Sequence, residues 1–244
     1  MKKLFLLLMI IGVTSNLSAQ NKTEDSLKTE KLRKESGVDP TRVASRASYS
    51  FLYYDQGNSL GQINNKATLT LGVNRWSFAM KYEVISKNGK IPGSGFTTGM
   101  GDVKSALAAS AEISMPTGKP EFGSQYFSIT PALTYSYTIQ PSLFLAVQPQ
   151  YTFHVLKDPI YPSLSVLTVR SFIAKFTKNG YFYVFEPRPV FDFGNNTTDL
   201  ILSPIIGKSL GGGFNLLFLA EFSTNASVKN TRGNLFQLGF NKNF

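Results

Sequence analysis

The sequence predicts an all-β fold, a transmembrane antiparallel up-and-down β-barrel of about twelve strands, with ten strands as the alternative. Three observations lead to this prediction: an N-terminus typical of exported proteins, short segments that alternate apolar and polar residues, and a final strand that ends on an aromatic ring. No segment after residue 20 approaches the roughly 18 apolar residues that a spanning helix needs. Because lipid offers no partners to unpaired backbone groups, such an exported chain can cross a membrane only as a closed barrel.

Residues 1–19 have the organisation of a secretory signal peptide. Lys2 and Lys3 precede an apolar run over residues 4–13, and a stretch of small and polar residues ends at Ala19. The run is too short for a membrane anchor, so we expect cleavage after Ala19. The chain contains no cysteine, which excludes a lipoprotein cysteine, disulfides and thiolate metal sites.

Residues 20–46 form a polar leader that differs from the rest of the chain. This stretch is rich in both acidic and basic residues and has hardly any aromatic ones. A short helix over residues 26–34 is compatible with the pattern, but Leu27 and Leu32 are too sparse to make an apolar face. The composition therefore favours a solvated periplasmic leader over a folded plug.

The barrel is expected over residues 47–244. Segment 76–85 is the clearest strand, because Trp76 and Phe78 alternate with polar or small residues such as Lys81. Turn residues separate eleven segments of this kind: 47–54, 66–73, 76–85, 103–113, 125–139, 143–155, 163–176, 181–193, 199–208, 214–222 and 234–244. An even number is needed, so either a twelfth strand lies in 37–46 or 86–102, or one assigned strand is not real.

The final strand carries apolar residues at every second position and ends on Phe244. It resembles the closing strand of bacterial outer-membrane barrels, which implies insertion into the outer membrane with Phe244 as the signal read by the barrel assembly machinery. The expected surroundings are outer-membrane lipid and lipopolysaccharide. Such barrels have short periplasmic turns and longer outer loops, and the tight turns at Gln140, Lys178 and Gly211 alternate with longer connections in this way.

Two short motifs resemble a second group of outer-membrane proteins. Thr98-Gly99-Met100-Gly101-Asp102 and Met115-Pro116-Thr117-Gly118 are similar to motifs of the family named for the MetA pathway of phenol degradation, a distant relative of the FadL-like transporters. The ending Ser18-Ala19-Gln20 of the signal region is similar to envelope proteins of Bacteroidetes type. The resemblance implies a barrel that carries a small hydrophobic ligand.

Charged side chains on the predicted inner face are the candidate site. They could form a polar constriction that selects permeants by charge, or they could pair with one another and fill a narrow interior. Both readings stay open, and Glu186 with Arg188 is the pair of first interest. The lumen candidates are Lys81, Glu83, Glu112, His154, Arg170, Glu186, Arg188, Asp192 and Glu221.

Pro187 and Pro189 flank Arg188 on the presumed lipid side of one strand. Proline cannot donate to a ladder, so a bulge or a local opening of the sheet is expected there. FadL-like transporters release substrate sideways through a wall opening, and the two prolines raise the hypothesis of a lateral opening in this chain.

Other function classes are less consistent with the sequence. The formal net charge is +10, but the basic residues are scattered and form no stripe, which argues against nucleic-acid binding. His154 is the only histidine, so the general base of a hydrolase and a metal or cofactor site are both poorly supplied, and we expect no enzyme. We predict a passive channel or transporter for small, possibly hydrophobic, molecules. The alternatives are a closed structural, adhesion or assembly barrel and, third, an envelope-lipid-modifying enzyme.

Overall fold

The computed structural model describes residues 24–55, 60–87, 90–104, 106–116, 126–157, 159–225 and 233–244. The predicted signal peptide, residues 1–19, lies outside these ranges. One helix and twelve strands make up the described chain: α2 (Glu24–Ser36), β1 (Arg46–Tyr54), β2 (Gln62–Val73), β3 (Trp76–Lys87), β4 (Lys90–Lys104), β5 (Leu107–Pro116), β6 (Tyr126–Gln140), β7 (Leu143–Lys157), β8 (Ser165–Phe176), β9 (Tyr181–Asp192), β10 (Thr197–Gly211), β11 (Phe214–Ser223) and β12 (Leu235–Asn243).

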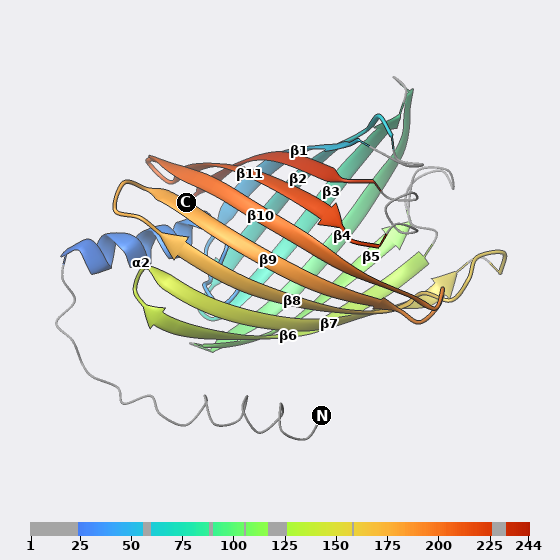
Figure 1. Ribbon diagram of the computed structural model, residues 1–244, viewed down its shortest axis with the longest axis horizontal. Helices are drawn as coiled ribbons and strands as arrows, with labels where there is room; N and C mark the ends of the chain where they lie inside the picture. Colours follow the sequence, from blue (N-terminus) through green and yellow to red (C-terminus); the bar gives the residue numbers. More distant parts are fainter. Residues whose placement is uncertain are drawn as a thin grey trace.

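The twelve strands form a single closed antiparallel barrel in which each strand pairs with its neighbours in sequence (Figure 1). The first and last strands close the barrel, with β1 paired to β12 from Arg46 opposite Asn243 to Tyr54 opposite Leu235. Closure leaves no free sheet edge, which is the only way a sheet can satisfy its backbone groups in lipid. The predicted fold class, with twelve strands, is confirmed.

The strand that the sequence pattern did not assign is β4, in one of the two regions expected to hide it. Its sequence, KIPGSGFTTGMGDVK, contains four glycines. Glycine has no side chain to place on either face, so the alternation that identifies a strand is lost although the backbone still pairs. β4 pairs with β3 from Trp76 opposite Asp102 to Lys87 opposite Lys90, and with β5 along its other edge.

The two ends of the barrel differ in their connections. Tight turns follow β2, β6, β8 and β10 at the end where α2 and the C-terminus lie, called here the helix end (Figure 1). Positive φ angles occur in these turns at Asn74, Gly180 and the glycines 211–213, conformations that glycine and asparagine adopt most readily. The longer connections, which follow β1, β5, β7 and β11, lie at the opposite end, called the loop end.

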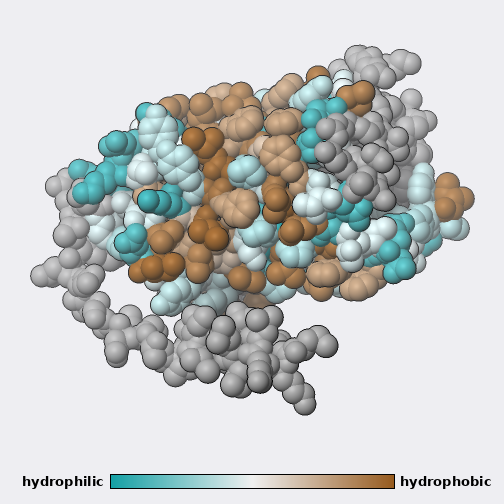
Figure 2. Space-filling view, viewed as in Figure 1, coloured by the Kyte–Doolittle hydropathy of each residue, from teal (hydrophilic) through white to brown (hydrophobic). Residues whose placement is uncertain are grey.

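The outer wall of the barrel is apolar in a central band. Large hydrophobic side chains are exposed along the outward positions of the strands, and Figure 2 shows them as a belt between hydrophilic ends. A soluble protein rarely exposes a continuous apolar surface of this size, whereas a membrane barrel requires one. Members of the belt include Phe51, Leu71, Phe78, Met80, Tyr135, Phe185, Phe218, Leu238 and Phe240. In the described chain, no helix is long and apolar enough to cross a membrane.

Residues 24–45, called the mouth segment, cover the helix end of the barrel (Figure 1). Leu32 packs among Phe144, Phe176 and other inward apolar side chains of β7, β8 and β9. Arg33 is only 2% exposed, and its Nε donates to the Asp39 carboxylate at 2.5 Å. Burial lowers the pKa of the Arg33 guanidinium, an effect that the Asp39 carboxylate opposes. The described part of the leader is thus folded against the barrel rather than solvated, because polar contacts replace the apolar face that it lacks.

Candidate functional site: a polar lumen with two charged clusters

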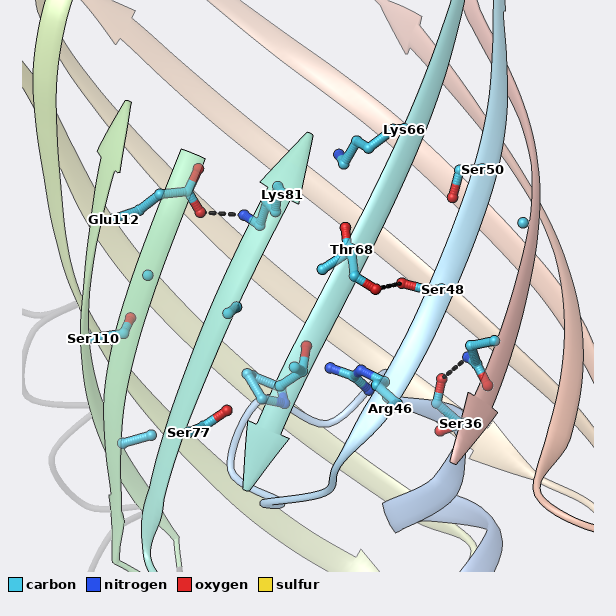
Figure 3. A pocket seen from close by; sticks show the side chains of 18 of the residues that line it. Ser36, Arg46, Ser48, Ser50, Lys66, Thr68, Ser77, Lys81, Ser110 and Glu112 are labelled. Atoms are coloured by element: carbon cyan, nitrogen blue, oxygen red, sulfur yellow. Dashed lines mark hydrogen bonds and ion pairs between the residues drawn. The ribbon is translucent and has the colours of Figure 1, made fainter. Parts of the chain in front are cut away.

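The lumen beside strands β1 to β5 is an open polar cavity. Inward positions in this part of the wall carry mainly serine, threonine, alanine and glycine, whose small side chains leave a cavity of about 400 Å³ (Figure 3). Hydroxyl groups that face it include those of Ser48, Ser50, Thr68, Thr70, Ser77 and Ser110. A lining of this kind offers hydrogen-bond partners to a polar solute.

Three basic residues of this wall form the cationic cluster: Arg46 on β1, Lys66 on β2 and Lys81 on β3 (Figure 3). Lys81 Nζ forms an ion pair with Glu112 on β5. The side chains of Arg46 and Lys66 form no hydrogen bond and no ion pair with any residue that the structure describes. Neither charge forms an ion pair within the described wall, although Lys66 lies directly opposite Glu83 in the β2–β3 ladder and is attracted by that carboxylate.

The Arg46 guanidinium occupies space that Gly37 leaves free. Gly37 ends the mouth-segment helix with a φ of +72°, and a Cβ at this position would lie 1.6 Å from Arg46 Nη1. Glycine is therefore required twice here, for its backbone conformation and for its missing side chain. This fit holds Arg46 at the boundary between the cavity and the mouth segment.

A chain of ion pairs runs along the inner wall from β8 and β9, across β10, to β11. Arg170 donates to both carboxylate oxygens of Glu186, from Nε at 2.6 Å and from Nη2 at 3.1 Å. Arg188 then joins Glu186 to Glu221, with 2.9 Å contacts to each. Glu186 is completely buried, and two arginines balance two glutamates in this group. These four residues, called the ion-pair chain, match the expectation that lumen charges pair and fill the interior.

The remaining lumen candidates are Glu83, Asp192 and His154, of which Glu83 lies beside the cationic cluster, opposite Lys66 in the β2–β3 ladder. Glu83 accepts a hydrogen bond from Asn64 at 2.6 Å. Asp192 lies at the end of β9 and accepts hydrogen bonds from Asn195, which fixes a turn at the loop end. His154 Nδ1 lies 3.2 Å from the backbone nitrogen of Leu164, so its described contact is with a loop and not with a carboxylate. Among the described residues, no group of three or more metal-type side chains occurs.

Sequence reasoning did not single out Arg46 or Lys66. Lys66 follows the same inward alternation as Thr68 and Thr70, so its orientation was readable from β2. Its importance depends on what faces it across the lumen, and this information is absent from a strand pattern. Arg46 was assigned to the leader, one residue before the expected start of the barrel.

Pro187 and Pro189 coincide with an interruption of the β8–β9 ladder. Paired residues run from Val166 to Thr168 and resume at Ile173, so the four residues between them on β8 have no partners on β9. The pairing of β9 with β10 on its other edge continues through both prolines. The N–H donors that the two prolines lack are therefore missing from the edge of β9 that faces β8. A lateral opening between β8 and β9 remains a hypothesis.

Phe244 lies at the helix end with its ring 79% exposed, and its backbone N–H donates to the Ser45 carbonyl at 3.1 Å. Exposure of the ring leaves it available to lipid or to another protein. Its role as an insertion signal remains a prediction.

A closed twelve-stranded barrel with an apolar belt and a polar lumen defines the class: the fold is that of bacterial outer-membrane porins and channels. No protein-family model and no curated protein sequence matches the chain. Among solved structures, a KdgM porin is similar with a TM-score of 0.59 and 10% identity over 82% of this chain and 99% of that one. A NanC porin gives 0.62 and 6% identity over 82% and 100%. An outer membrane channel from Pseudomonas putida F1 gives 0.60 and 10% identity over 85% and 100%.

Of the two motifs that resemble the MetA-pathway family, Thr98–Asp102 lies on β4, and Met115 and Pro116 end the neighbouring strand β5, where Met115 pairs with Phe96. Thr117 and Gly118 lie outside the described residues. The structures reported above are porins and channels, so the resemblance to the FadL-like transporters stays a prediction. That the protein is not an enzyme stays a prediction, made from its single histidine.

Proposed function

We propose that this protein is a passive outer-membrane channel that favours small anionic solutes. The observation that carries the proposal is the presence of Arg46 and Lys66 in an open polar cavity without a hydrogen bond or ion pair to a described residue. A cation held in a narrow lumen attracts counter-ions more strongly than one in bulk water, since the walls focus its field. A passing anion is therefore stabilised at this level of the pore.

The opposite wall does not cancel this preference. The ion-pair chain contributes two positive and two negative charges that already neutralise one another at distances of 2.6–3.1 Å. Lys81 is likewise paired with Glu112. Glu83, opposite Lys66 in the β2–β3 ladder, offsets one of the two remaining positive charges, so Arg46 and Lys66 leave an excess of positive charge among these lumen residues. Charged rings or clusters of this kind are a usual source of ion selectivity in pores.

The lining favours a polar permeant over the hydrophobic one that the sequence left possible. Serine and threonine hydroxyls line the cavity beside β1 to β5. The buried apolar side chains gather instead on the wall of β7 to β9, around Leu32 and Phe144. One of the structurally similar porins, KdgM, has been solved in complex with disordered oligogalacturonate. For this chain, the class of solute rests on its own cavity residues.

Ion selectivity in planar lipid bilayers tests the proposal. In a salt gradient, the reversal potential of the wild-type channel should show a preference for anions. The variant Arg46→Gln/Lys66→Gln should lose most of this preference at unchanged expression. Lys208→Gln is the matched control, because Lys208 contacts Tyr181 on the outer wall and does not face the cavity. The selectivity of this control should equal that of the wild type.

Two results contradict the proposal in different ways. A cation-selective channel would show that charges other than Arg46 and Lys66 dominate the lumen. A purified barrel that conducts no ions under any condition, including those that release the mouth segment, would favour a closed structural, adhesion or assembly barrel. Contacts with outer-membrane lipid, lipopolysaccharide and the assembly machinery are part of the same proposal and would hold for either kind of barrel.

A further inference from the structure

We propose that the mouth segment is a reversible plug that gates the helix end of the lumen. The proposal rests on the function proposed above, because a gate requires a channel. It starts from the position of the segment, which contacts strands on widely separated parts of the barrel wall.

On one side, the mouth segment is bound to β6 and β7. Arg33 Nη1 donates to Thr138 at 2.8 Å, and the Arg33 guanidinium lies 4.1 Å from the centre of the Phe144 ring. The Thr41 hydroxyl lies 3.0 Å from that of Ser136. These contacts attach the segment through both its helix and the turn that follows.

On the other side, three asparagines of β11 and β12 hold the end of the helix. Asn215 and Asn243 donate to the Glu35 carbonyl at 3.2 and 2.7 Å, and Asn241 donates to the Ser36 carbonyl at 3.1 Å. These carbonyls belong to the last turn of α2, which has no partners of its own for them. Four strand interfaces separate β7 from β11 in the barrel order, so the segment spans the mouth.

The segment also forms the floor of the polar cavity. Ser36, Gly37 and Pro40 line it, together with wall residues of β1 to β5 (Figure 3). Arg46, the first residue of β1, lies against Gly37. Withdrawal of the mouth segment would therefore join the cavity to the solvent at the helix end, beside the cations that select the permeant.

The contacts that hold the segment are of a kind that water can replace. Its described ion pairs join residues of the segment itself: Arg33 with Asp39, Arg42 with Asp39 and Glu30, and Lys31 with Glu35. The segment can thus leave without separating them. Its bonds to the wall end on hydroxyl and amide groups, whose exchange for water changes the free energy little. A permanent filling would instead need apolar area, and Leu32 is the one buried apolar residue of the described helix.

A disulfide lock tests this gate directly, since the chain contains no native cysteine. In Thr41→Cys/Ser136→Cys, the two replaced hydroxyls lie 3.0 Å apart, close enough for a bridge between the segment and β6. We expect low, steady conductance in the oxidised protein. Reduction should raise the mean conductance at least twofold and restore transitions between levels.

The matched control places a disulfide within the wall. Thr130 and Thr152 face one another across β6 and β7 with hydroxyls 2.9 Å apart, so Thr130→Cys/Thr152→Cys tests the effect of a bridge that leaves the mouth segment free. Its conductance should not depend on the redox state. A second variant, Thr138→Val, removes a wall contact of Arg33 without altering the segment and should increase the open fraction.

The outcomes separate the gate from the channel. Equal conductance of the oxidised and reduced lock variant would overturn the gate, while the reversal potential would still report whether the pore prefers anions. Absence of conductance in both redox states and in Thr138→Val would overturn both proposals. Redox-dependent conductance without anion preference would support the gate and contradict the proposed selectivity.

Discussion

Arg170 of β8 and Glu186 of β9 form two parallel hydrogen bonds across the stretch where the backbone ladder between these strands is interrupted. The side chains thus connect two strands that Pro187 and Pro189 prevent from pairing through their backbones. Bidentate arginine–carboxylate contacts are among the stronger and more directional hydrogen bonds in proteins. The ion-pair chain therefore acts as a structural link as well as a filling of the lumen.

Glu186→Gln should destabilise the barrel. The glutamate is fully buried between Arg170 and Arg188, and its neutral replacement leaves two cations without their shared partner. We expect the free energy of unfolding to fall by about 3 kcal/mol. This value is the lower end of the usual cost of removing one partner from a buried ion pair, because Arg170 is partly exposed. Denaturant unfolding of the lipid-inserted barrel measures it. Glu83→Gln, which removes the charge of a residue hydrogen-bonded to Asn64, should cost less than about 1 kcal/mol. Equal losses in the two variants would contradict the linking role of Glu186.

Pro187→Val/Pro189→Val tests the lateral opening. Valine supplies the two missing N–H donors, so the β8–β9 ladder should close and stability should rise by roughly 1–2 kcal/mol. If hydrophobic molecules leave through this wall, cellular uptake of radiolabelled toluene should fall in the variant. Pro131→Val/Pro149→Val repairs a similar interruption between β6 and β7 and should leave uptake unchanged. Uptake at the wild-type rate in the first variant would rule out the opening.

Gly207→Ala should destabilise the barrel through crowding. A Cβ at this position of β10 would lie 2.0 Å from the ring of Phe182, which is fully buried in the apolar cluster near the helix end. Overpacking of a filled site costs about 1–3 kcal/mol. Gly99→Ala is the control, since its nearest neighbour, the Ala111 carbonyl oxygen, would lie at an ordinary 3.5 Å. Unfolding midpoints of the two variants should therefore differ, and a neutral Gly207→Ala would mean that Phe182 can move aside.

Gly37→Ala should loosen the mouth segment. The new Cβ would collide with the Arg46 guanidinium, and alanine is strained at a φ of +72°. Single-channel recordings should show a larger open fraction than in the wild type. Gly212→Ala introduces similar backbone strain at a φ of +56°, where nothing lies within 4 Å of the added atom, and should gate normally. An unchanged open fraction in Gly37→Ala would show that this close fit does not hold the segment in place.

Alternation along the strands was enough to predict the barrel and the inward direction of most lumen charges. It placed Arg170, Glu186, Arg188 and Glu221 on inner faces, but their association depends on the stagger of β8, β9 and β11, which no single strand reveals. β4 escaped assignment because glycine leaves no alternation. The leader was expected to be solvated because its composition offers no apolar face. The contacts that hold it against the barrel, such as the hydrogen bond from Arg33 to Thr138, join residues more than a hundred positions apart and cannot be read from the local pattern.

The pairing of β1 with β12 sets the order of events in folding. Tyr54 and Leu235 are partners, and beside them Asp55 exchanges hydrogen bonds with Asn234. These contacts join the two ends of the barrel sequence, so they cannot form until the whole barrel has been synthesised. Until then β1 presents an open edge that can pair with another chain. A chain that ends before β12 would keep this edge open and would therefore be prone to aggregation.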